Sequence, residues 1–312
     1  MPSHPHITGI EIGALSPPII RSDMTTRPGR SRRRKVAFVL GGGGHMGAYE
    51  VGMLRALSES GIEPDLVVGN SVGALNGAAI AADPAPSTVD RLEEVWTSLD
   101  KTGVFSGSVF SGAANLVRTR TSVHSNRPLR TLIQRLLPPT FEDLKVPFQC
   151  VAACIERASE HWFSEGPLAE AILASSAVPG ILPAVVINGE HFIDGGIVNS
   201  IPIDRAVQLG GTVIFVLHVG RIERPLSPPK NPWQVAMVAF EIARRHRFAR
   251  DMASLPEGVV AHVLPTGEPE PPPYDSLGQL RYRNFRSVGR RIRLAHRATA
   301  AYLAEAGLTK RD

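Results

Sequence analysis

The chain has 312 residues, of which 43% are hydrophobic and 20% are charged, and this composition is typical of a globular protein with a sizeable core. Its apolar runs all fall short of the roughly 20 residues that a membrane-spanning helix needs. Residues 1–20 lack the long apolar stretch of a signal peptide. Composition therefore argues against a membrane-spanning or secreted protein, and we expect a cytoplasmic one.

The net charge of +5 is concentrated near the N-terminus. Residues 21–35 contain seven Arg or Lys and one Asp, whereas residues 36–312 are neutral in sum. We expect residues 1–34 to form a disordered basic arm, with attraction to an anionic lipid or a nucleic acid as the alternative. No interleaving of aromatic and basic residues supports nucleic-acid binding.

Short apolar runs begin directly after this arm and predict β-strands. We expect eight strands, at residues 36–40, 66–69, 148–155, 161–163, 184–187, 191–193, 213–218 and 259–263.

Helical patterns separate most of these strands. We expect helices at residues 47–60, 72–82, 89–99, 128–136, 167–174, 203–209, 233–252 and 277–306. Strands interleaved with helices predict an α/β fold with a mainly parallel sheet covered on both faces. Residues 100–127 are rich in Gly, Ser and Thr, and we favour a long insertion over a lid for them.

The two cysteines, Cys150 and Cys154, fall in one predicted strand. Four residues of strand place them on one face about 13 Å apart, at about 3.3 Å per residue. That separation is too long for a disulfide, so we expect two reduced core thiols.

The first strand leads into a glycine-rich loop. Gly42, Gly44 and Gly47 have the spacing G-x-G-x-x-G of a dinucleotide-binding fold. Such a fold needs an acidic residue at the end of the second strand, and Asp65 instead precedes that strand. A Walker loop is excluded, because no Gly-Lys-Ser/Thr follows the glycines. The loop therefore needs another explanation.

The second strand ends in Gly-Asn-Ser-Val-Gly at residues 69–73, which fits the G-x-S-x-G pattern. On a tight turn between a strand and a helix, the Ser71 hydroxyl is exposed, while Gly69 and Gly73 leave room for close packing. The N-terminus of the following helix favours a developing negative charge. We predict that Ser71 is a nucleophile, and a structural turn serine is the alternative.

A nucleophilic Ser71 gives the glycine loop a use. Attack on an ester carbonyl creates an oxyanion, and one backbone donor to it can contribute about 3 kcal/mol of transition-state stabilisation. We expect this oxyanion hole to use the amides of Gly43 and Gly44, with Gly42 supporting the loop. The alternative is a tight turn with no catalytic role.

The nucleophile also needs a base. None of the ten histidines, among them His45, His191 and His218, has a sequence signature of its own. Asp194 ends a predicted strand, and Gly195 and Gly196 follow it and allow close backbone approach. A carboxylate can act as a base when burial raises its pKa. We predict that Asp194 is this base; an aspartate that caps its own turn is the alternative.

Four segments occur in the order typical of one family: GGGGHMGA, GIEPDLVVGNSVGALNGA, SSAVPGILPAV and DGGIVNSIP. In these segments the chain resembles the patatin-like phospholipases over residues 36–218. The resemblance implies an α/β three-layer sandwich in which Ser71 and Asp194 form a dyad without histidine and the glycine loop forms the oxyanion hole. It implies hydrolysis of acyl esters, typically of lipids, without a metal or another cofactor. We therefore expect residues 35–312 to form one hydrolase domain, with its C-terminal helices within residues 233–306.

One position departs from the family pattern. Met46 stands where the family loop usually has a basic residue that helps to hold the loop. The adjacent His45 can compensate in part. Two alternatives to a lipid hydrolase remain. One is a soluble esterase or thioesterase that uses the same dyad on small acyl substrates, and the other, which follows from Met46, is a binding module with a weakened site.

The C-terminal segment is rich in arginine. Residues 279–298 contain seven Arg and no acidic residue, and apolar residues recur there at steps of three and four. We expect a terminal helix that docks through its apolar face and leaves its arginines in water. The alternative is peripheral contact with an anionic membrane, and the same two options apply to the Arg-rich end of residues 233–250.

Overall fold

A single β-sheet forms the centre of the fold. The computed structural model describes residues 34–102, 122, 124–219, 225–268 and 287–309, and these contain eight strands. The strands are β1 (Val36–Leu40), β2 (Leu66–Asn70), β3 (Phe148–Cys154), β4 (Ser159–Phe163), β5 (Val185–Ile187), β6 (Glu190–Asp194), β7 (Val213–Leu217) and β8 (Val260–Val263).

The sheet is mainly parallel. Its strand order is β5-β6-β3-β2-β1-β7-β8, and β4 pairs with β3 beside this path. Strands β3, β2, β1, β7 and β8 run parallel, while β4, β5 and β6 join antiparallel. In the β1–β2 register, Leu40 lies opposite Gly69, so the two central strands end at the same edge. This edge positions the candidate site.

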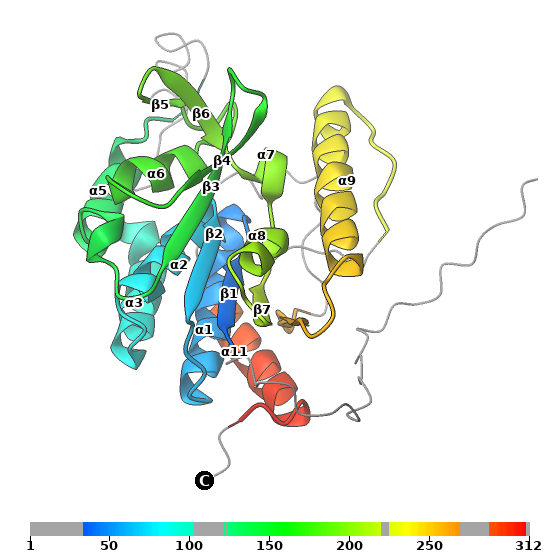
Figure 1. Ribbon diagram of the computed structural model, residues 1–312. Helices are drawn as coiled ribbons and strands as arrows, with labels where there is room; N and C mark the ends of the chain where they lie inside the picture. The colour runs from blue at the N-terminus through cyan, green and yellow to red at the C-terminus, as the bar shows by residue number, and fades with distance from the viewer. Residues whose placement is uncertain (1–33, 103–121, 123, 220–224, 269–286, 310–312) are drawn as a thin grey trace, which may run out of the picture.

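Helices cover both faces of the sheet. In chain order they are η1 (Gly44–Gly47), α1 (Ala48–Glu59), α2 (Val72–Ala82), α3 (Pro86–Thr102), α5 (Arg127–Leu136), η2 (Phe141–Asp143), α6 (Leu168–Ser175), α7 (Gly196–Asn199), α8 (Ile203–Gln208), α9 (Pro232–Ala253) and α11 (Val288–Glu305). Alternate β1 residues enter different cores: Phe38 packs with residues of α1, α2 and α11, and Val39 packs with residues of α8 and α9. The predicted α/β/α sandwich is confirmed (Figure 1).

The predicted elements agree with the structure in type, and most differ only at their ends. The largest difference is α3, which begins at Pro86 and continues to Thr102, into the segment that we expected to be an insertion. Proline is favoured in the first turn of a helix, which explains the earlier start. The short elements η1, η2 and α7 were not predicted. Cys150 and Cys154 are buried and reduced on β3, as expected.

Some predictions fall outside the described residues. These are the basic arm, except for Arg34, most of the segment 100–127, and residues 277–286 of the last helix. Within the residues that the structure describes, no helix is both long and apolar enough to cross a membrane.

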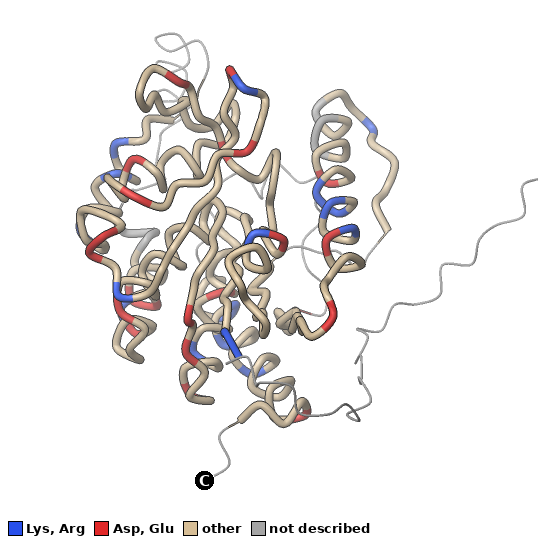
Figure 2. Tube along the Cα trace, viewed as in Figure 1, with Lys and Arg blue, Asp and Glu red and all other residues tan. Residues whose placement is uncertain are grey.

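The arginines of the C-terminal helices mostly serve the fold. On α9, Arg244 and Arg245 both pair with Glu241, at 2.6 and 2.8 Å. Figure 2 shows the interleaved positive and negative residues of this helix. On α11, Arg290 pairs with Glu268, and the Arg291 guanidinium lies over a tyrosine ring of α1. The described part of α11 docks through its apolar face as expected, but Arg291 is buried rather than left in water, because it packs over this ring.

Candidate active site

Ser71 lies on a sharp turn between β2 and α2. Its φ of 54° and ψ of −123° are strained for a residue with a side chain. The turn is possible because Gly73 packs against β1, where a Cβ would lie 2.4 Å from the Leu40 carbonyl oxygen. The Ser71 amide donates a hydrogen bond to the Ser175 hydroxyl at 2.9 Å. This local geometry is a strained strand-to-helix turn, the arrangement in which we predicted a nucleophile.

The end of β6 brings Asp194 to the same place. The Ser71 hydroxyl donates a 2.6 Å hydrogen bond to Oδ2 of Asp194, and the Gly196 amide donates a 2.7 Å bond to Oδ1. Only 6% of Ser71 and 7% of Asp194 are exposed. Burial raises the pKa of Asp194 to about 6, although the bonds from Ser71 and Gly196 lower it. A carboxylate with this pKa can accept a proton from the hydroxyl near neutral pH.

The glycine loop approaches Ser71 from the end of β1. The Gly42 amide donates to the Ser200 carbonyl oxygen at 3.1 Å, which fits a supporting role. Among the described residues, the amides of Gly43 and Gly44 make no hydrogen bond to a protein acceptor. Gly44 has a φ of 56°, a conformation that glycine adopts without strain. Two backbone amides that have no acceptor among the described residues are a suitable anion-binding group.

Most of the other predicted glycines lie where a side chain would not fit, and Gly196 is the exception, because its Cβ would have no neighbour nearer than 3.0 Å. A Cβ would come within 2.6 Å of a neighbouring atom at each of Gly42, Gly47, Gly69 and Gly195. The nearest atom at Gly195 is the Val151 carbonyl oxygen of β3, at 2.3 Å. The glycines at these four positions therefore let the Ser71 turn, the glycine loop and the Asp194 loop pack together.

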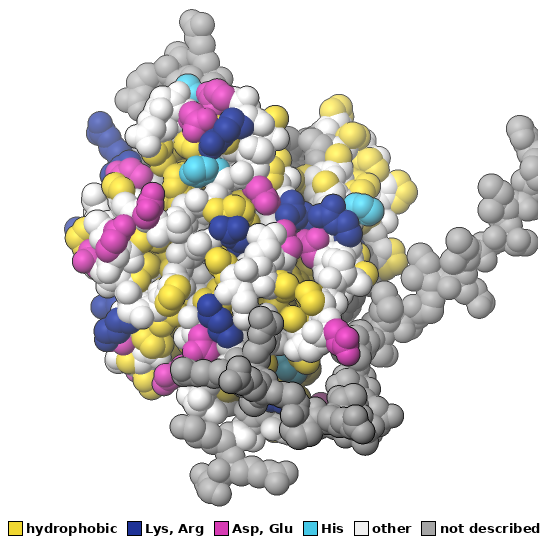
Figure 3. Space-filling view, in the orientation of Figure 1, with side chains coloured by type: hydrophobic (Ala, Val, Ile, Leu, Met, Phe, Trp, Pro, Cys, Tyr) yellow, Lys and Arg dark blue, Asp and Glu magenta, His cyan; other side chains and the backbone are white. Residues whose placement is uncertain are grey.

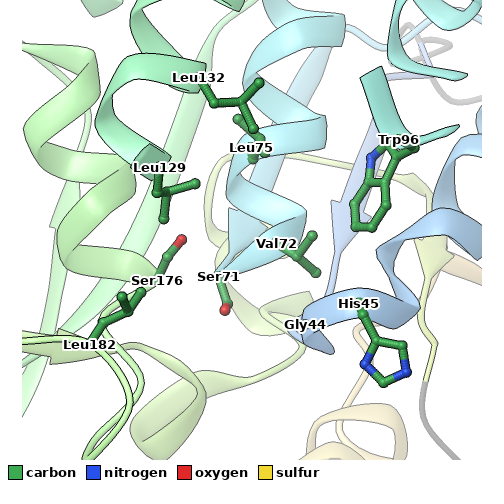
Figure 4. Close-up of a pocket in the computed structure, with 10 residues that line it drawn as sticks. All are labelled: Gly44, His45, Ser71, Val72, Leu75, Trp96, Leu129, Leu132, Ser176 and Leu182. Carbon is green, nitrogen blue, oxygen red and sulfur yellow. The ribbon is translucent and has the colours of Figure 1, made fainter. Parts of the chain in front are cut away.

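A small cavity opens beside Ser71. Its volume is about 40 Å³, enough for only a few water molecules. The wall is mainly apolar, and Figure 4 shows the side chains of α2, α3 and α5 that line it around the Ser71 hydroxyl. The helix residues are Val72, Leu75, Trp96, Leu129 and Leu132, and Leu182 joins them from the segment between α6 and β5. This cavity can accept the apolar part of a substrate.

Sequence reasoning missed these lining residues and Ser175. Ser175 lies in the SSAVPGILPAV segment that supported the family resemblance. The sequence therefore marked this segment, but it did not indicate that Ser175 would contact Ser71. The leucines of α5 had no local signal, because a leucine on an amphipathic helix predicts core packing. Met46 packs against the hydrophobic core rather than reaching a polar partner.

The three histidines considered above occupy different places. His191 is exposed and pairs with Glu156 at 2.6 Å. His218 is buried, with Nε2 3.2 Å from Arg244. His45 is buried in the cavity wall beside Gly44.

The sequence of this chain is similar to that of known proteins. The family model "Patatin-like phospholipase" matches residues 38–207. Lysophospholipase nte1 of Aspergillus terreus is 30% identical over 191 residues, which are 61% of this chain and 12% of that protein. The patatin-like phospholipase domain-containing protein 7 of Rattus norvegicus is 30% identical over 207 residues, which are 65% of this chain and 15% of that protein. This chain thus matches only about an eighth to a seventh of the length of these relatives.

A comparison of structures gives a more distant match. The crystal structure of VipD from Legionella pneumophila aligns with 87% of this chain and 67% of its own chain. The sequence identity is 13% and the TM-score is 0.43.

Proposed function

Since this chain belongs to the patatin-like phospholipase family, we propose that it hydrolyses acyl esters of lipids, with Ser71 as nucleophile and Asp194 as its base. The observation that carries this proposal is the 2.6 Å hydrogen bond between the two buried side chains. The names of the two relatives, a lysophospholipase and a patatin-like phospholipase domain protein, support a lipid substrate.

The first half of the proposed reaction forms an acyl-enzyme. Asp194 takes the hydroxyl proton while the Ser71 oxygen bonds to the acyl carbon, and the carbonyl oxygen becomes an anion. The amides of Gly43 and Gly44 donate hydrogen bonds to this anion. The tetrahedral intermediate then expels the alcohol, which takes the proton from Asp194. An acyl group remains on Ser71.

The second half releases the acid. A water molecule gives a proton to Asp194 and bonds to the acyl carbon, again with the negative oxygen on the glycine loop. The intermediate expels the Ser71 oxygen, which regains the proton from Asp194. One ester and one water give one carboxylic acid and one alcohol, and the enzyme returns to its initial state.

A fluorophosphonate ester probe tests this proposal, because it phosphonylates only an activated serine. We expect the purified protein to be labelled at Ser71, and labelling to fall in Ser71→Ala and Asp194→Asn. Folded wild-type protein that is neither labelled nor active on esters would contradict the proposal and favour the binding module. Wild-type labelling rates in Asp194→Asn would exclude the dyad.

The cavity volume favours a second candidate, an esterase of small acyl substrates. A cavity of about 40 Å³ cannot hold a long acyl chain without a change of shape. A series of p-nitrophenyl esters with chains of increasing length separates the two candidates. A maximum of kcat/KM at the shortest chains would favour the small-substrate esterase.

A lipid hydrolase also needs a surface that meets the lipid. Figure 3 shows hydrophobic atoms gathered over α9, where Val235 and Ile242 are 53% and 54% exposed. They are seven residues apart and therefore lie on one side of the helix. We expect peripheral contact with an anionic membrane to use this side, and Val235→Asp to weaken vesicle flotation. Binding that is unchanged by Val235→Asp but abolished by high salt would instead assign the contact to basic residues.

A further inference from the structure

A buried polar network lies behind the glycine loop. The Asn76 amide nitrogen, on α2, donates to the Gly47 carbonyl oxygen at 3.2 Å and to Oε2 of Glu50, on α1, at 2.7 Å. The indole nitrogen of Trp96, on α3, donates to the Asn76 side-chain oxygen at 3.0 Å. Glu50 and Asn76 have no exposed surface. Three helices thus meet at one carboxamide.

The orientation of this carboxamide follows from its partners. An indole nitrogen can only donate, so the Asn76 oxygen must face Trp96. Both N–H groups of Asn76 therefore point toward Gly47 and Glu50, where each finds an acceptor. Trp96 and Glu50 together hold the donor that reaches the glycine loop.

Gly47 connects the Asn76 hydrogen bond to the candidate active site. It is the last residue of η1 and directly precedes α1. A Cβ at Gly47 would lie 2.5 Å from Val72, the residue after the nucleophile, and 2.9 Å from the Trp96 ring. Val72 and Trp96 also line the cavity beside Ser71. The backbone at Gly47 therefore has little freedom to shift while Asn76 holds it.

Glu50 is an acidic residue at a fully buried position, which is unusual. A buried carboxylate is costly without a positive partner, and none of the ion pairs among the described residues includes Glu50. Burial raises its pKa well above the ordinary value, while the Asn76 bond lowers it. Burial thus favours the protonated form of Glu50, and Oε2 accepts the hydrogen bond from Asn76.

We propose that Glu50 and Asn76 are positioning residues for acyl transfer, because they hold the Gly47 carbonyl and thereby the Gly43 and Gly44 amides at the distance that the oxyanion requires. This inference rests on the proposed function of Ser71. It assigns a catalytic consequence to residues that do not touch the substrate.

The test compares kinetics with stability in four variants. Glu50→Ala and Asn76→Leu remove the network, and Trp96→Phe removes only the indole donor as a milder change. Glu50→Gln preserves an acceptor for Asn76 and matches a neutral acid in shape. We expect kcat for p-nitrophenyl butyrate to fall about 10- to 100-fold in the first two variants, with KM within about twofold. Fluorophosphonate labelling of Ser71 should slow in parallel, and Glu50→Gln should restore both rates.

Arg55→Met is the matched control. Arg55 also joins α1 to α3, through Asp90 at 2.9 Å and Glu93 at 2.7 Å, but it does not contact the glycine loop. We expect this variant to lower the melting temperature without changing kcat. The inference is overturned if Glu50→Ala, Asn76→Leu and Trp96→Phe behave like Arg55→Met, with wild-type kcat and labelling in the folded protein. If Glu50→Ala and Asn76→Leu do not fold, a wild-type kcat in Trp96→Phe is enough to overturn the inference. Absence of labelling in the wild type would overturn the proposed function, and this inference with it.

Discussion

The amide of Gly42 donates a hydrogen bond to the carbonyl oxygen of Ser200, 3.1 Å away. Gly42 belongs to the loop after β1, and Ser200 directly follows α7, the helix that begins two residues after Asp194. This bond therefore ties the glycine loop to the Asp194 segment. Because Ser71 lies between them, a displacement of either loop should change both the predicted base and the predicted oxyanion donors.

Gly43 offers a direct way to displace the glycine loop. A Cβ there would lie 2.1 Å from Cγ2 of Val219, although the extended φ of 175° suits any residue. We expect Gly43→Ala to lower kcat/KM about 100-fold, since small misplacements of catalytic groups have effects of this size. The double variant Gly43→Ala/Val219→Ala should recover most of the activity, because it removes the clashing methyl. Equal activity of the single and double variants would show that steric displacement is not the cause.

The pH dependence of activity should report Asp194. Its pKa is raised from 3.8 to about 6, mainly by burial. The base must be ionised to accept the Ser71 proton, so kcat/KM should rise with pH and be half-maximal near pH 6. Rates for a p-nitrophenyl ester between pH 4.5 and 8 give this profile after correction for product ionisation. A profile that is flat from pH 4.5 to 8 would assign the proton transfer to another group.

The same burial predicts a conflict between activity and stability at Asp194. Its folded-state pKa lies above its ordinary value, so the native state binds the proton more tightly than the unfolded state does. The free energy of unfolding therefore falls as pH rises from about 4 to 6 and stays lowered above pH 6. A shift of about two units corresponds to about 3 kcal/mol.

Asp194→Asn removes this charge and should raise the free energy of unfolding at pH 8 by about 2–3 kcal/mol while it nearly abolishes turnover. Near pH 4 the variant and the wild type should be equally stable. Urea titrations at both pH values measure the difference. An equal or lower stability of the variant at pH 8 would contradict the ionised, buried Asp194.

The sequence located the parts of the site whose backbone is unusual. The Ser71 turn needs glycines at 69 and 73, and the Asp194 loop needs one at 195, so these positions are visible in the chain. The strands were equally visible, because central parallel strands are continuous apolar runs.

Contacts between side chains that are far apart in the sequence cannot be predicted from a local sequence pattern. From the sequence, Glu50 is a polar residue in the first turn of an amphipathic helix. It is the packing of α1 against α2 that buries Glu50 beside Asn76. The wall of the cavity depends in the same way on where α5 docks, which no local pattern specifies. No local pattern predicts α7, a single helical turn that begins with glycine, a residue of low helix propensity.

The leucines of α5 should control the acyl chains that the site accepts. Leu132 lines the cavity, whereas Leu136 lies one turn later on the same helix and is buried in the core instead. We expect Leu132→Ala to enlarge the cavity and to raise kcat/KM for the p-nitrophenyl ester of a 12-carbon acid relative to that of a 4-carbon acid by about 10-fold, the effect of one or two better-accommodated methylenes. Leu136→Ala is the control for loss of stability without a change of cavity. Equal shifts in the two variants would mean that the acyl chain binds elsewhere, because of these two leucines Leu132 lines the cavity beside Ser71 and Leu136 does not.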